Sequence, residues 1–220
     1  MRADTREAVK ASLNLTDAQC DDVNFHDYYH YTDSIVSIEF EGALPLREEY
    51  WTDDLWLEMN EFQRVYLTDW FTKSSRDLLN SRELRKPMKL MQQKVNDMLG
   101  IQNEDSDTSK DLKYFIFSSH DTQVDNMVVW LTQNKTSFDY TPYASNVMFE
   151  LNYSDKCLEE TPSEDCFGVE VIYNGETLDL CSGSEPTCPF ADFKDYMASI
   201  WYSGPHSDDL DAACFQKYNP

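Results

Sequence analysis

The stretch that most constrains the fold runs from Lys113 to Leu131 and reads KYFIFSSHDTQVDNMVVWL. Its residues Tyr114 to Phe117 are aromatic or β-branched, which is typical of a strand buried on both faces. A polar turn follows, and Thr122 is placed to cap a helix whose apolar residues recur on one face. The predicted order is strand, turn and helix. His120 and Asp121 then lie at the carboxyl end of the strand and the positive end of the helix, where α/β proteins bind anions.

The SSHDT sequence after a hydrophobic strand resembles the histidine-aspartate motif of the histidine acid phosphatases, the branch of the histidine phosphatase superfamily that includes the prostatic and lysosomal enzymes. Further stretches keep the order of that family: TPYAS at 141–145, VEVIYNGETLDL at 169–180 and CSGSEPTCPFADF at 181–193, with a weaker match at 44–66. Together the stronger stretches cover roughly the second half of the chain.

This resemblance implies an α/β fold in which a histidine-phosphatase-like central sheet is flanked by helices on both faces. Residues 103–220 are then the C-terminal part of the phosphatase-like domain. Residues 1–102 form a mostly helical insert or cap region. We therefore expect the chain to be the C-terminal portion of a longer acid phosphatase.

The resemblance also assigns roles at the polar turn. His120 contacts the phosphoryl group of a phosphomonoester substrate, and Asp121 protonates the leaving oxygen. A cationic imidazole suits the phosphoryl charge, and a neutral carboxylic acid suits the leaving alkoxide. Because the reference pKa of aspartic acid is about 3.9, such an enzyme works best in acid. The structural alternative is that both residues only satisfy backbone groups at the turn.

The sequence departs from the family at the nucleophile. Histidine acid phosphatases carry it in an N-terminal Arg-His-Gly motif, and no Arg-His pair occurs here. The other histidines, His26, His30 and His206, stand in different sequence contexts. We therefore expect little or no phosphatase activity from this chain alone. The alternative function is a non-catalytic secreted glycoprotein or binding module on the same scaffold.

We expect neither a cofactor nor a metal. His26 and His30 stand four residues apart, a spacing that on a helix offers two metal ligands, but no Glu follows the first His as in a zincin. Packing and surface hydrogen bonding are the preferred interpretation of this pair.

The charge and hydropathy of the chain narrow its partners. A formal charge of -23 and a pI near 4.3 disfavour nucleic acid and anionic membrane surfaces. No stretch approaches the roughly 18 apolar residues of a membrane span.

Six cysteines in a chain of this size indicate an oxidising compartment. Cys157 and Cys166 flank one loop-like interval, and Cys181 and Cys188 flank another, although six cysteines allow 15 connectivities. The resemblance favours the second pair, because the family has a small disulfide loop there.

Cys20 and Cys214 remain, and each pairs either with the other by elimination or with a partner upstream of this sequence. Acceptor triplets for N-glycosylation begin at Asn14, Asn134 and Asn152. These features predict a secreted or lysosomal protein. The N-terminal sequence lacks the apolar core of a signal peptide, so we expect a leader in a missing upstream segment.

Periodicity supplies the remaining elements. It predicts helices over residues 5–13, 53–70, 82–99 and 189–201 and strands over 146–153, 167–173 and 176–180. Thr52 or Asp53 caps the second helix, and Pro87 falls near the first turn of the third. Asn174-Gly175 is the strongest hairpin signal.

Overall fold

The computed structural model describes residues 3–21, 24–42, 52–69, 71–103, 111–133, 141–181 and 186–215. These residues belong to two compact units. The first comprises residues 1–70 with 138–141, and the second comprises residues 71–137 with 142–220. The helical region predicted from the sequence extends to residue 102.

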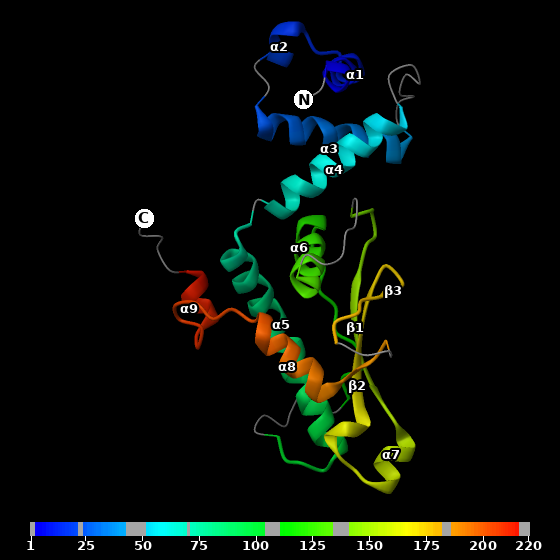
Figure 1. Ribbon diagram of the computed structural model, residues 1–220, viewed down its shortest axis with the longest axis vertical. Coiled ribbons are helices and arrows are strands. Elements are labelled where there is room, and N and C mark those ends of the chain that lie inside the picture. Colours follow the sequence, from blue (N-terminus) through cyan, green and yellow to red (C-terminus); the bar gives the residue numbers. More distant parts are fainter. Residues whose placement is uncertain are drawn as a thin grey trace. The chain divides into compact units, whose positions relative to one another are not determined.

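The described part of the first unit is helical (Figure 1): α1 (Ala3–Leu13), α2 (Asp17–Asp21), α3 (Phe25–Glu41) and α4 (Asp53–Asp69). Asn24 begins α3 with a capping box, in which its side chain accepts from the Asp27 N–H and the Asp27 side chain accepts from the Asn24 N–H. Gly42 ends that helix at φ 60°, a left-handed conformation that glycine adopts without strain. The Thr52 hydroxyl accepts from the Leu55 N–H, which confirms the predicted cap of α4.

An apolar core joins α1, α3 and α4. Its buried residues are Ala8, Val9, Tyr28, Ile35, Val36, Leu55 and Met59. The rings of Tyr29 and Tyr66 stack beside it with centroids 4.0 Å apart. The first unit is therefore held by apolar and aromatic packing between helices.

In the second unit, α5 (Lys73–Met98) begins nine residues before the predicted start at Arg82. The Thr72 hydroxyl caps it by accepting from the Ser75 N–H at 3.2 Å. Pro87 therefore lies inside the helix and not in its first turn, so that prediction is wrong. Few apolar residues occur between Lys73 and Arg82, which is why periodicity did not reveal the first turns.

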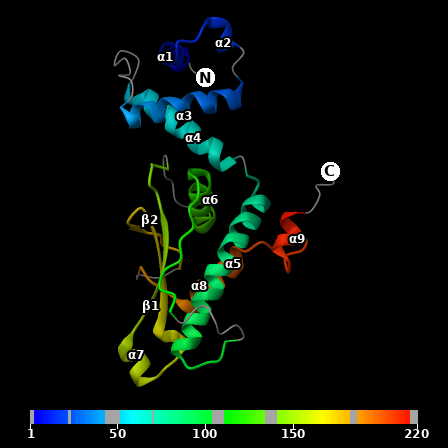
Figure 2. The ribbon, with the colours of Figure 1, turned by 180° about the vertical axis from the view of Figure 1, so that it is seen from behind.

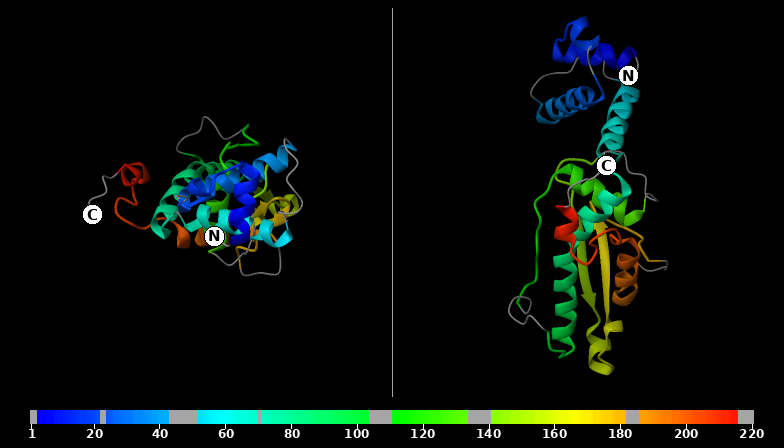
Figure 3. Two further views of the ribbon diagram at one scale, coloured as in Figure 1. Left: turned by 90° about the horizontal axis from the view of Figure 1, so that it is seen from above. Right: turned by 90° about the vertical axis from the view of Figure 1, so that its left-hand side faces the viewer.

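The predicted strand from Tyr114 to Phe117 is wrong in this structure. The segment is extended but pairs with no described strand, and Figure 3 draws it as a tube. Its four side chains have exposed fractions of 73%, 40%, 73% and 51%. The Phe115 ring contacts Phe117 and lies under the Lys86 ammonium. A β-propensity run becomes a strand only where a neighbour pairs with its backbone, and none of the described strands does so here.

The helix α6 (Asp121–Thr132) follows this segment. Its residues from Asp125 to Thr132 are all buried, so the second half is enclosed on every side. The Trp130 indole donates to the Ile200 carbonyl at 3.1 Å, and the Tyr196 hydroxyl donates to the Leu131 carbonyl. These bonds tie the far end of α6 to the C-terminal part of the chain.

The sheet is small and antiparallel. Its strands are β1 (Val147–Tyr153), β2 (Phe167–Tyr173), β3 (Glu176–Thr177) and β4 (Cys188–Pro189), with β2 paired to all three others. Asn174 and Gly175 have φ of 50° and 87°, which confirms the predicted hairpin turn. Because β1 connects to β2 through α7 (Asp155–Glu160) and the 3-10 turn η1 (Glu164–Cys166), these lie at one end of the strands (Figures 1 and 2).

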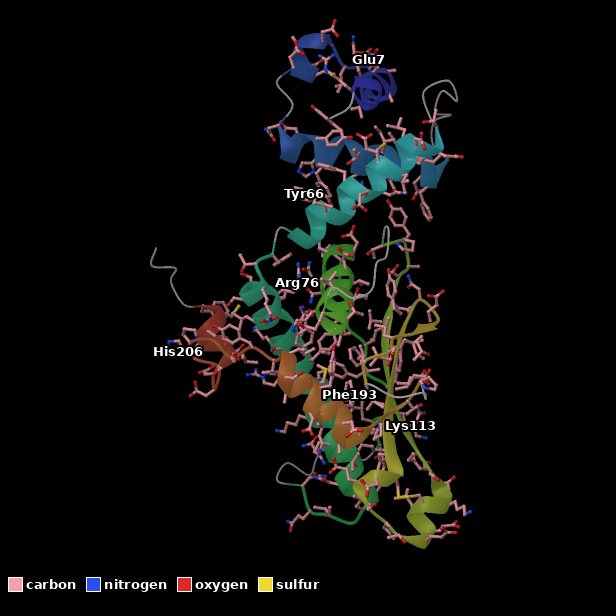
Figure 4. The ribbon with its side chains drawn as sticks, viewed as in Figure 1. Glu7, Tyr66, Arg76, Lys113, Phe193 and His206 are labelled. Atoms are coloured by element: carbon pink, nitrogen blue, oxygen red, sulfur yellow. A yellow bond between two sulfur atoms is a disulfide. The ribbon has the colours of Figure 1, made fainter. Side chains whose placement is uncertain are left out.

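One helix, α8 (Phe190–Ile200), packs against β2 and confirms the predicted terminal helix. Its residues Phe190, Phe193, Met197 and Ile200 are buried as predicted. Phe193 points to the sheet, where its ring lies 6.4 Å from that of Phe149 (Figure 4). A last helix, α9 (Leu210–Cys214), contacts α5. The chain is thus mixed α/β, with a small antiparallel sheet and helices.

Candidate functional site

The predicted site residues lie at the start of α6. His120 is the residue before the helix, with φ -88° and ψ 166°. Its carbonyl accepts the first helical bonds, from the Gln123 N–H at 3.0 Å and the Val124 N–H at 3.1 Å. Its imidazole makes no capping bond and is exposed. The side chain is therefore presented to solvent while its backbone is fixed in the helix.

Contrary to the prediction, Thr122 is not the cap of α6: His120 occupies the cap position, and Asp121 is the first residue of the helix. The Asp121 Oδ1 atom accepts from the Thr122 N–H at 2.7 Å, and the side chain is otherwise exposed. The first N–H groups of a helix have no carbonyl partner within it and carry partial positive charge. An exposed imidazole, an exposed carboxyl group and the Asp121 N–H at the positive end of the helix form an arrangement that can receive an oxyanion.

A polar layer between α5 and α6 supports this turn. We define it as Arg76, Asn80 and Glu83 on α5 with Gln123 and Asn126 on α6. Gln123 Nε2 donates to Glu83 Oε2 at 2.7 Å and to Asn80 Oδ1 at 3.3 Å. Arg76 Nε donates to Asn126 Oδ1 at 3.0 Å, and Figure 4 shows Arg76 on the side of α5 that faces α6.

Asn126 joins the polar layer to the first turn of α6. The Asn126 Nδ2 atom donates to the Thr122 backbone carbonyl at 2.7 Å. The backbone carbonyl of Asn126 accepts from Asn80 Nδ2 at 3.4 Å. Asn80 and Asn126 are fully buried, and buried amides are stable only when bonded. The layer therefore specifies how α6 sits on α5.

Glu83 is the ionisable acid of the polar layer. Burial raises the pKa of its carboxyl group above the usual range, while the hydrogen bond from Gln123 and the charge of Arg82 act in the opposite direction. A desolvated carboxylate forms a stronger hydrogen bond than one in water. The hydrogen bond between Gln123 and Glu83 is therefore a direct link between α5 and the first turn of α6.

Sequence reasoning missed the polar layer. Arg76, Asn80 and Glu83 recur at positions i, i+4 and i+7 and so share one helix face, but a polar face is usually interpreted as solvated. Gln123 and Asn126 are likewise polar residues within an apolar helix. Two matching polar faces on neighbouring helices were the available signal.

The other histidines belong to other parts of the chain. His206 has φ 58° and lies beside α9 (Figure 4), and α9 lies on the opposite side of α5 from α6 (Figures 1 and 2). His26 and His30 both lie on α3 in the first unit, four residues apart as predicted. Within the described ranges, no three His, Cys, Asp or Glu side chains gather closely enough to hold a metal ion.

Both predicted disulfides are present, Cys157–Cys166 and Cys181–Cys188. Cys20 and Cys214 are free thiols, so the pairing by elimination is wrong. Cys20 is buried in the first unit, and Cys214 is exposed in the second.

Two of the glycosylation triplets lie within the described ranges. Asn14 is exposed between α1 and α2, and Asn152 is exposed on β1. Asn134 lies outside the described residues. Both described acceptors are therefore accessible to modification.

Among the helices of the described residues, none is both long and apolar enough to cross a membrane. Comparison of the chain with protein families, with curated proteins and with solved structures found no match. The functional assignment therefore depends on the geometry at the start of α6 and on the sequence motif that it contains.

Proposed function

We propose that this chain is the C-terminal part of an acid phosphatase-type phosphomonoester hydrolase of the histidine acid phosphatase family. The observation that supports the proposal is the placement of His120 and Asp121 together at the exposed N-terminal turn of α6. Such a turn favours anions, and a phosphomonoester is an anion whose leaving oxygen needs a proton.

In this proposal, the His120 imidazole and the Asp121 N–H at the start of α6 hold the phosphoryl oxygens, since the Thr122, Gln123 and Val124 N–H groups already have acceptors. Asp121 supplies the proton to the alkoxide as its bond to phosphorus breaks. Because Oδ1 of Asp121 accepts from the Thr122 N–H, Oδ2 is the oxygen that carries the proton. The reaction needs a carboxylic acid that can donate a proton to the leaving oxygen and a cationic group beside the phosphoryl oxygens.

The covalent step needs a nucleophile; the sequence lacks the Arg-His-Gly motif that supplies it in the resembled family, and His206, the other histidine of the second unit, lies beside α9. We therefore expect the chain to bind inorganic phosphate without turning over a phosphomonoester. Efficient hydrolysis of para-nitrophenyl phosphate by the purified chain would contradict this part of the proposal.

Phosphate binding is measured from the imidazole resonances of His120 by NMR at mildly acidic pH. We expect inorganic phosphate to shift these resonances and His120→Ala to abolish binding. His206→Ala is the matched control, since it removes an exposed histidine of the same unit. Equal responses of His120 and His206 to phosphate would indicate non-specific charge binding and overturn the proposal.

A second candidate function is a secreted binding module. The exposed apolar run from Tyr114 to Phe117 favours it, because exposed apolar patches often mark interaction surfaces. The two disulfides are consistent with a secreted or lysosomal protein in either case. If phosphate leaves the His120 imidazole resonances unchanged, the result would favour the binding module.

A further inference from the structure

Two separate links fix the first two turns of α6 against α5. One is made by Gln123, whose Nε2 atom donates to Glu83 and to Asn80. The other is made by Asn126, which accepts from Arg76 and donates back to the Thr122 carbonyl. Gln123 and Asn126 are three residues apart and share one face of α6. Two links on one face oppose rotation of the helix about its own axis.

The exposed end of α6 is less restrained by packing than its buried end. The segment from Asp125 to Thr132 is enclosed by packing, whereas His120 and Asp121 are exposed and have no packing of their own. Gln123 lies only two residues after Asp121, and its backbone N–H bonds to the His120 carbonyl. The side chain of Gln123 is therefore the nearest point at which α5 can control the direction of the site.

We propose that Glu83 is a positioning residue for the site at the start of α6: by accepting the Gln123 amide, it holds the turn in which His120 faces a bound oxyanion. The inference rests on the proposed function, since it assigns a role to the same site. Glu83 acts through Gln123 and touches no ligand itself. A hydrogen-bond acceptor at position 83 should therefore be sufficient to hold the turn, and the negative charge of Glu83 should not be required.

The variants follow from that requirement. Glu83→Gln keeps an oxygen that can accept from Gln123, whereas Glu83→Ala removes it. Glu159→Ala is the matched control, because it deletes an exposed carboxylate on α7 of the same unit. Asn80 is a poorer target, since it is fully buried and its replacement perturbs folding.

The experiment measures phosphate affinity from the His120 imidazole resonances and, in parallel, amide exchange of Gln123 and Val124, whose N–H groups bond to the His120 carbonyl. We expect Glu83→Ala to weaken phosphate binding about tenfold, the effect of losing one hydrogen bond, and to speed exchange at both amides. Glu83→Gln should restore both. Glu159→Ala should change neither.

A purely structural role would lower the melting temperature of Glu83→Ala while its folded fraction bound phosphate normally, and that result overturns the inference. Unchanged amide exchange in Glu83→Ala also overturns it. Failure of the wild-type chain to bind phosphate rejects the proposed function and, with it, a role in oxyanion binding. Amide exchange then still decides separately whether Glu83 orders the turn.

Discussion

Gly168 permits the close approach of β4 to β2, and its replacement by alanine should destabilise the second unit. Gly168 lies opposite Asn152 of β1 and Pro189 of β4. A Cβ atom added there would lie 2.6 Å from the Thr187 Cγ2 atom and 2.9 Å from the Cys188 carbonyl oxygen. Both distances are shorter than van der Waals contact, so the neighbours must move.

The two clashes differ in how easily they are relieved. The Thr187 methyl group can rotate away, but the Cys188 oxygen is backbone in the strand that pairs with Val169. Overpacking of this kind costs about 1–3 kcal/mol, and alanine regains about 0.4–1 kcal/mol by restricting the unfolded chain. We therefore expect Gly168→Ala to lower the free energy of unfolding by about 1–2 kcal/mol.

Hydrogen exchange of the β2 amides measures this change within the second unit. Thr187→Ser removes only the methyl group, and by itself it should be nearly neutral. Combined with Gly168→Ala, it should recover less than half of the lost stability if the Cys188 carbonyl is the main obstacle. Complete recovery, or exchange of Gly168→Ala at the wild-type rate, would refute this reasoning.

Three further predictions concern the disulfides and the charges of the second unit. Replacing Cys157 and Cys166, nine residues apart, by serine should lower its free energy of unfolding by about 2.5 kcal/mol in urea denaturation, and reductant should then have no further effect through this bridge. Glu83→Gln should be at least as stable as the wild type at neutral pH, and this difference in stability should shrink in acid. Burial raises the pKa of Glu83, so the wild type gains stability on protonation as the pH falls through the pKa of the folded state. A difference in melting temperature that stays the same from neutral to acidic pH would count against this prediction. Hydrogen bonds from Arg82 and Arg85 lower the pKa of Asp211 in the folded state. The stability that these bonds give to the contact between α9 and α5 should therefore be fully present above the unfolded pKa of about 3.9 and be lost as the pH falls through the folded pKa. Equal amide exchange of α9 in Asp211→Asn and in the wild type at neutral pH would argue against this role of Asp211.

Local chemistry was enough to predict several elements. Asn174-Gly175 defines its hairpin because both residues adopt positive φ at low cost. The terminal helix α8 was predicted down to its buried residues, because one apolar face meets the sheet and the opposite face meets water. In each case the conformational or burial preference of a few residues agrees with the environment that they occupy in the structure.

The same reasoning failed where the outcome depends on a distant neighbour. The residues from Tyr114 to Phe117 have strong β-propensity, yet no described strand pairs with them. Propensity reports how well side chains fit a pleated surface, and it does not provide the surface. The polar layer was missed for the same reason, since Asn80 and Asn126, 46 residues apart in sequence, become buried only because their two helices meet.

The construction of α6 explains how an exposed site can still be an ordered one. Its second half is immobilised by burial and by the bond from Trp130 to the Ile200 carbonyl, which fixes the axis. The polar layer then fixes rotation about that axis, and neither restraint uses the side chains of His120 or Asp121. Those two side chains are thus left available for a ligand while their backbone is already in place, which lowers the entropic cost of binding. If the proposed function holds, substitutions at the exposed end should change ligand contacts directly, whereas substitutions in the polar layer should change the direction in which the site faces.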